Sequence, residues 1–189
     1  DLGQNAKSNY LTLTGNKLFV SDHENGRVYA IDVESQEVLH TIETGKVPRV
    51  VRTNEAGTKL YIAVSGSNLL EVYDTETFEQ LTTITMNGNA TDVVITEDES
   101  MAVVTELESN QVEVVDLTNE EIVSTIPDLA GAKHISFNRK QTRAYVTLSG
   151  SNEVSVIDME TKEVVETIEV GNAPHGVEIK ALPGIGGSC

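Results

Sequence analysis

The sequence has few basic and few aromatic residues, no tryptophan and a single cysteine. Its 189 residues include 13 Lys and Arg against 30 Asp and Glu, which gives a formal net charge of −17. Nucleic acids and anionic membrane surfaces attract basic proteins, so neither is an expected partner. The only thiol, Cys189, excludes an internal disulfide as well as cysteine-based metal, iron–sulfur or haem sites within the fold. No apolar run approaches the ~20 residues of a membrane-spanning helix.

What the sequence has in excess is β-branched side chains, with 24 Val, 12 Ile and 20 Thr. Such side chains fit the pleated surface of a sheet, so the composition favours an all-β fold. No segment shows a sustained helical periodicity.

A repeat of 42 residues runs through the sequence. Four columns of similar residues share this spacing: Asp32, Asp74, Asp116 and Asp158; Ile42, Ile84, Ile126 and Ile168; Val51, Val93, Ile135 and Val177; Phe19, Tyr61, Val103 and Tyr145. Each repeat contains four short strand-like runs bounded by Gly, Asn, Asp or Ser, which is typical of a propeller blade.

The repeat predicts one β-propeller domain over residues 1–180, built from four 42-residue, four-stranded antiparallel blades. We place the blades at residues 9–43, 50–85, 92–126 and 134–169. A spare inner strand of a fifth blade is expected at 176–180, and residues 181–189 are interpreted as a flexible appended tail.

The last repeat carries a family resemblance. It contains Tyr145-Val146-Thr147, then Ser149-Gly150-Ser151-Asn152, and it ends with Pro174-His175-Gly176-Val177. These motifs resemble the YVTN family of β-propeller repeats, and the resemblance covers about residues 9 to 180. It implies an all-β propeller that is extracellular, on the cell surface or periplasmic in a bacterium or archaeon. It implies no single activity, because related propellers include surface-layer proteins, lactonase-like enzymes and redox-enzyme subunits.

Four blades and a spare strand raise the question of how the ring closes. An open half-ring exposes sheet edges and apolar blade faces. Three solutions are compatible with the sequence: a compact four-bladed ring, a larger ring completed by a second chain, or a fragment of a longer protein.

The candidate ligand-binding residues gather where the inner strands are expected to begin, at the mouth of the central channel. Arg49 and Lys133 align with His175 in the repeat, and His134 follows Lys133 directly. His23 lies in the first loop of the same face. Concave sites with a few converging polar groups are the usual ligand sites, and cationic groups stand out in so acidic a chain. A protein, a glycan or a small anionic molecule is the expected partner.

No metal or other cofactor is predicted. Three histidines suit zinc or copper, but His23, His134 and His175 come from different repeats without a local ligand spacing. The repeated Asp followed three residues later by Ser, Thr or Asn predicts a tight turn rather than a calcium loop. Two acidic residues, Glu106 and Glu108, are placed in the third loop of the channel face.

No catalytic residue is assigned, because the sequence lacks a G-x-S-x-G motif, a P-loop and a dinucleotide fingerprint. We therefore predict a non-catalytic binding or scaffold module of an extracytoplasmic or cell-surface propeller. The alternative is a propeller enzyme of lactonase or lyase type that uses His175 and carboxylates, or a metal or quinone redox protein.

Overall fold

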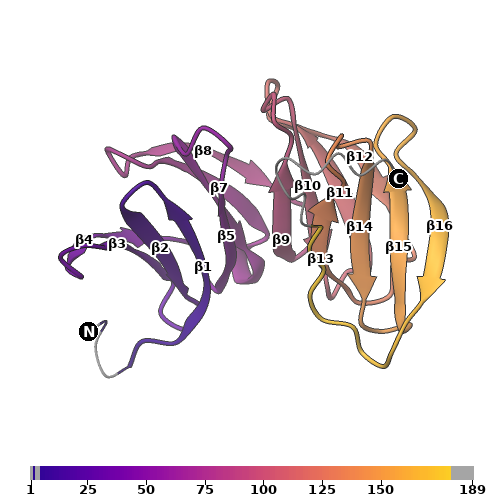
Figure 1. Ribbon diagram of the computed structural model, residues 1–189, viewed down its shortest axis with the longest axis horizontal. Helices are drawn as coiled ribbons and strands as arrows, with labels where there is room; N and C mark the ends of the chain where they lie inside the picture. Colours follow the sequence, from indigo (N-terminus) through magenta and orange to yellow (C-terminus); the bar gives the residue numbers. More distant parts are fainter. Residues whose placement is uncertain (1, 3–4, 180–189) are drawn as a thin grey trace, which may run out of the picture.

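The computed structural model describes residue 2 and residues 5–179. The strands in this part of the chain form four antiparallel sheets, each with four strands joined in sequence order. The sheets follow one another as the blades of a propeller (Figure 1). The predicted fold class, an all-β propeller with four four-stranded blades, is thereby confirmed. No helix among the described residues is long and apolar enough to cross a membrane.

The sixteen described strands are distributed evenly over the blades. Blade 1 contains β1 (Ser8–Thr14), β2 (Lys17–Asp22), β3 (Arg27–Asp32) and β4 (Val38–Glu43). Blade 2 contains β5 (Pro48–Thr53), β6 (Lys59–Val64), β7 (Leu69–Asp74) and β8 (Gln80–Thr85), with a 3₁₀ turn, η1 (Ser65–Ser67). Blade 3 contains β9 (Ala90–Ile95), β10 (Met101–Glu106), β11 (Gln111–Asp116) and β12 (Glu121–Ile126). Blade 4 contains β13 (Ala132–Phe137), β14 (Arg143–Leu148), β15 (Glu153–Asp158) and β16 (Glu163–Glu169).

Each blade starts one or two residues earlier than the sequence pattern places it. The inner strands pair irregularly near their beginnings, with register shifts between Ser8 and Leu11, between Pro48 and Val51, and between Ala132 and Ile135. Such irregularities break the alternation of side chains between the two faces. The hydrophobic pattern therefore does not mark the first residues of these strands.

The hydrophobic core lies between neighbouring blades, which bury apolar side chains on the faces that meet. Tyr61 of β6 and Val93 of β9 belong to the core between blades 2 and 3, and their exposed fractions are 2% and 0%. Both residues belong to the 42-residue columns, so the register of the repeat identifies core positions. Equivalent cores join blade 1 to blade 2 and blade 3 to blade 4.

The turns between the third and fourth strands of each blade are held by the repeated aspartates. Oδ1 of Asp74 accepts hydrogen bonds from the backbone N of Thr77 and Glu76, both at 2.8 Å. These bonds stabilise the carboxylate and hold the pKa of Asp74 below its usual range. The other three aspartates of the column make similar bonds: Asp32, Asp116 and Asp158. The predicted turn chemistry is thus confirmed.

The four described blades form an open arc. β1 packs against β5, β5 against β9, and β9 against β13 (Figure 1). Leu11 of β1 is 59% exposed on the free face of blade 1. Ile168 of β16 is 41% exposed, whereas the three equivalent isoleucines of blades 1 to 3 are nearly covered: Ile42, Ile84 and Ile126. In a compact four-bladed ring, blades 1 and 4 would cover these side chains, and in this arrangement they do not.

Residues 175–179 follow blade 4 in the way that each inner strand follows the preceding blade. Thr147 Oγ1 donates to the carbonyl of His175 at 2.9 Å. The same bond occurs 42 residues earlier, from Thr105 Oγ1 to the carbonyl of Lys133 at 2.7 Å. The backbone N of Ile179 donates to Ser136 Oγ of β13 at 3.3 Å. The segment therefore takes the place of a fifth inner strand without a regular strand ladder over 176–179, and residues 180–189 lie outside the described residues.

Candidate functional site

A row of polar and aromatic side chains connects the inner edges of the blades. Tyr10 lies on β1, Arg52 on β5, Asp92 on β9 and His134 on β13, and His175 lies in the segment after β16. Ion pairs, hydrogen bonds and ring contacts join them. We call these five residues the inner-strand network.

Asp92 is the centre of this network and is completely buried. Arg52 donates to both carboxylate oxygens, from Nε to Oδ1 at 3.1 Å and from Nη2 to Oδ2 at 3.2 Å. His134 Nδ1 lies 2.9 Å from Oδ2. The backbone N of Val93 and of Ile135 donate to the same carboxylate at 2.7 and 3.3 Å. Asp92 thereby ties three blades together, and none of its hydrogen-bonding capacity is lost on burial.

The protonation state of Asp92 follows from these contacts. Burial alone raises the pKa of a carboxyl group, but the hydrogen bond from His134 and the charge of Arg52 outweigh it and lower the pKa of Asp92. An ionised carboxylate only accepts hydrogen bonds, so Nδ1 of His134 carries the hydrogen in this pair. In the neutral imidazole, Nε2 is then the free acceptor.

Two aromatic contacts and one imidazole pair extend the network beyond Asp92. The Tyr10 and His134 rings stack with centroids 5.9 Å apart, and the Arg52 guanidinium carbon lies 5.9 Å from the Tyr10 centroid. On the other side, the centroids of His134 and His175 are 4.8 Å apart. Burial, helped by the charges of Lys133 and His134, lowers the pKa of His175. The ring contact between Tyr10 of β1 and His134 of β13 joins blade 1 to blade 4.

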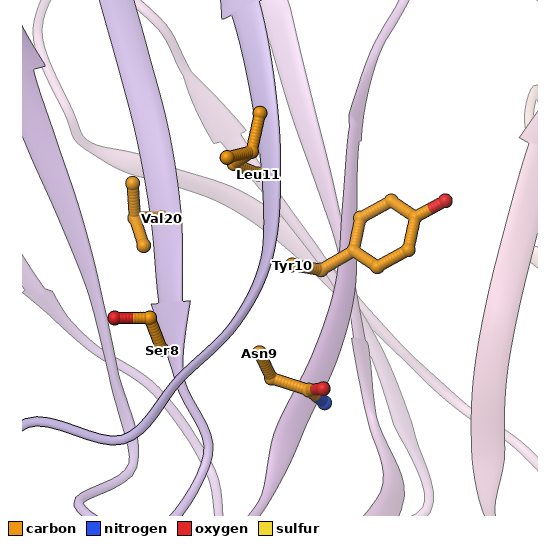
Figure 2. A pocket seen from close by; sticks show the side chains of 5 residues that line it. All are labelled: Ser8, Asn9, Tyr10, Leu11 and Val20. Atoms are coloured by element: carbon orange, nitrogen blue, oxygen red, sulfur yellow. The ribbon is translucent and has the colours of Figure 1, made fainter.

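A hollow of about 400 Å³ lies beside this network on the free face of blade 1. It is lined by Ser8, Asn9, Tyr10, Leu11 and Val20 (Figure 2). Figure 2 shows the Tyr10 ring pointing away from Leu11 and Val20. Most of its lining is apolar, which suits the face of a neighbouring blade better than a small polar ligand.

The structure brings two of the five sequence-predicted site residues into direct contact, His134 and His175. Lys133 lies close enough to influence the charge of His175. Arg49 lies near the start of β5, and its Nε is buried without a hydrogen-bond partner among the described residues. His23 is not joined to the histidine pair by any contact in the described part of the chain. Its Nδ1 instead donates to the carbonyl of Lys7 at 2.8 Å.

The sequence reasoning missed Tyr10, Arg52 and Asp92. A signal was present in the repeat, because inner-strand positions that are apolar in one blade are polar in another. One column contains Tyr10, Arg52, Val94 and Ser136. The column two positions earlier in the repeat contains Val50, Asp92, His134 and Gly176. The neighbouring column, which holds Arg49, Lys133 and His175, carries the more obvious cationic pattern.

A second set of buried acidic groups lies where the chain enters the blades. One carboxylate in each of the first three blades accepts a backbone N–H from the preceding loop: Lys7 N to Asp22 at 3.0 Å, Gly45 N to Glu71 at 3.0 Å and Asn87 N to Glu113 at 3.1 Å. Blade 3 has a second one, Glu106, which accepts from Gly88 N at 3.0 Å. Burial, and then the neighbouring Glu113, raises the pKa of Glu106 to about 7.

Comparisons with solved structures place this architecture among the propellers. The chain is similar to a Kuenenia stuttgartiensis hydrazine synthase, with 21% identity, a TM-score of 0.81, and coverage of 88% of this chain and 50% of that one. It is also similar to the Myceliophteria thermophila Cps50 (Swd1) β-propeller domain, with 14% identity and a TM-score of 0.79. That match covers 90% of this chain and 57% of the other. The chain thus spans about half the length of these solved chains, and at such identities the likeness shows the fold alone.

A comparison with curated proteins gave no match. A family model described as "YNCE-like beta-propeller" matches residues 5–182, which is nearly the whole chain. This match agrees with the resemblance to YVTN-type repeats and with the four blades of the structure. The chain belongs to the YNCE-like β-propeller family.

Proposed function

We propose that this chain is a non-catalytic binding module of an extracytoplasmic propeller, and that it holds a small anionic ligand at the start of the inner strands. The observation that carries the proposal is that cationic or titratable groups recur at one position of the repeat in a chain of net charge −17. Arg49 and Lys133 stand at equivalent positions of β5 and β13, and His175 continues the column. In an acidic protein, such a group of donors attracts an anion to one place.

Two further features support this position. The buried Nε of Arg49 has no acceptor among the described residues, and a buried donor gains free energy when it finds one. Arg52, by contrast, is already neutralised by Asp92 and has a structural role. The proposed ligand therefore contacts Arg49, Lys133 and His175 rather than Arg52.

The test is a calorimetric titration of the full chain with inorganic phosphate and, separately, with citrate. We expect saturable binding of at least one of them, and we expect Arg49→Ala combined with Lys133→Ala to weaken it tenfold or more. The matched control is Arg139→Ala with Lys140→Ala, which removes the same charge from two exposed residues of the β13–β14 turn. Equal weakening by both double variants, or no effect of the first, contradicts the proposed site.

A second candidate function, a propeller enzyme, is favoured by one observation. The ionised Asp92 orients His134 through Nδ1, which is the arrangement that prepares an imidazole to take a proton at Nε2. Hydrolysis of simple lactones by the full chain, lost in His134→Gln with an unchanged melting temperature, supports the enzyme over the binding module.

A further inference from the structure

We propose that His134 and His175 bind a divalent late transition-metal ion, with Cu²⁺ bound more tightly than Zn²⁺. Imidazole nitrogens suit both ions, and the general order of affinities places Cu²⁺ above Zn²⁺. The sequence alone does not predict this site, because the two histidines lie 41 positions apart without a local ligand spacing. Their contact is a product of the tertiary structure.

The separation of the two rings agrees with joint coordination of one ion. Metal–nitrogen bonds to histidine are about 2.0–2.1 Å long, which puts the ion about 3.2 Å from a ring centroid. Two such ligands at 90° to 109° then have centroids about 4.5 to 5.2 Å apart. The observed separation is 4.8 Å, with an angle of 35° between the ring planes. The centroid separation therefore lies within the range that joint coordination of one ion requires.

The support behind His134 is the arrangement that metal-binding histidines use. Such a histidine commonly donates its second ring N–H to a carboxylate, which fixes its orientation and makes the metal-binding nitrogen more basic. Asp92 provides this contact at 2.9 Å, and it is completely buried and held by Arg52. His134 is itself nearly buried, whereas His175 is exposed and accessible to an ion from solution.

The charges around the pair limit how tightly an ion is held. Asp92 contributes a negative charge, and Arg52 and Lys133 contribute positive ones. No group of three or more His, Cys, Asp or Glu side chains among residues 5–179 is arranged to hold a metal. Two imidazoles are therefore the protein ligands, and the other coordination positions belong to water or to an anion.

The metal site shares His175 with the proposed anion site, but one variant separates the two kinds of binding. Replacing Lys133 by Ala removes a positive charge near His175. This change weakens the binding of phosphate or citrate at the proposed anion site. It strengthens the binding of a cation at the histidine pair, because a repulsion is removed. The two affinities thus move in opposite directions.

The experiment is a Cu²⁺ titration of the full chain that carries Cys189→Ser, so that the thiol does not compete for the ion. Electron paramagnetic resonance reports the nitrogen ligands, and competition with Zn²⁺ gives the relative affinity. We expect one Cu²⁺ per chain with two imidazole nitrogens. His175→Gln should weaken binding tenfold or more and leave one imidazole in the spectrum.

The controls use the other two histidines of the chain. His40 is exposed and stacks on Phe78 with centroids 4.9 Å apart, and His23 is bonded to Lys7. His40→Gln and His23→Gln should leave the affinity and the spectrum unchanged, and Lys133→Ala should increase the affinity. A loss of binding in His40→Gln equal to that in His175→Gln overturns the proposal. So does a spectrum without imidazole nitrogen.

Discussion

Glu106 offers a quantitative test of how this fold tolerates buried acidity. Glu106 and Glu113 are both completely buried in blade 3. Glu106 Oε1 accepts from Gly88 N at 3.0 Å and Oε2 from Gln111 Nε2 at 2.6 Å. Burial and the neighbouring Glu113 raise the pKa of Glu106 from an ordinary 4.5 to about 7. The folded state thus favours the protonated form below about pH 7.

The sign and size of the effect follow from linkage. A carboxyl group whose pKa is raised by folding contributes its full share of stability only below the pKa that it has in the unfolded chain. That stability is lost as the pH rises through the folded pKa. A shift from 4.5 to about 7 corresponds to about 3 kcal/mol of unfolding free energy at high pH, from about 1.4 kcal/mol per pKa unit. We therefore expect the chain to lose stability at this group as the pH rises from about 4.5 to about 7, with little further loss at higher pH.

The perturbation is Glu106→Gln, which removes the charge and keeps an acceptor for Gly88 N. Urea unfolding at pH 5, 7 and 9 measures the free energy of unfolding. The value for Glu106→Gln should increase relative to that of the unmodified chain as the pH rises, by up to about 3 kcal/mol at pH 9. Glu108→Gln is the control, because Glu108 is exposed in the same loop. If the difference between Glu106→Gln and the unmodified chain is the same at all three pH values, the reasoning is refuted.

Three further predictions concern the core, the turns and the site. Val93→Asp should lower the unfolding free energy by about 3 kcal/mol or more, because it places an unpaired charge in the core between blades 2 and 3; thermal melts should show no such loss for Val123→Asp, where the side chain is exposed. Glu120 has a φ of 59°, so Glu120→Gly should raise stability by up to about 1 kcal/mol in urea unfolding, whereas Glu121→Gly in β12 should lower it. Phosphate affinity should rise as the pH falls through the pKa of His175, which lies below its ordinary 6.5, because the ring then gains a positive charge; a calorimetric affinity that is flat down to pH 5 contradicts a role for this ring.

The sequence determined the blades of this protein, because a propeller blade is a local structure. The four strands of a blade are close in the chain, and alternation with a period of two marks their faces. Val93 and Tyr61 were identifiable as core residues from their 42-residue columns alone. Asp74 was identifiable as a turn residue, because the hydrogen bonds that it accepts come from residues two and three positions later.

The tertiary structure alone decided the site. Arg52 and Asp92 lie 40 positions apart and Asp92 and His134 lie 42 apart, so their contacts depend on how neighbouring blades pack. The sequence placed Glu106 in a polar loop, but it ends β10 and is completely buried. A single sequence does not distinguish an exposed loop glutamate from a buried glutamate that accepts a hydrogen bond from Gly88 N. The open arc is likewise set by the angle between blades, which arises from the packing of large surfaces and leaves no local pattern in the chain.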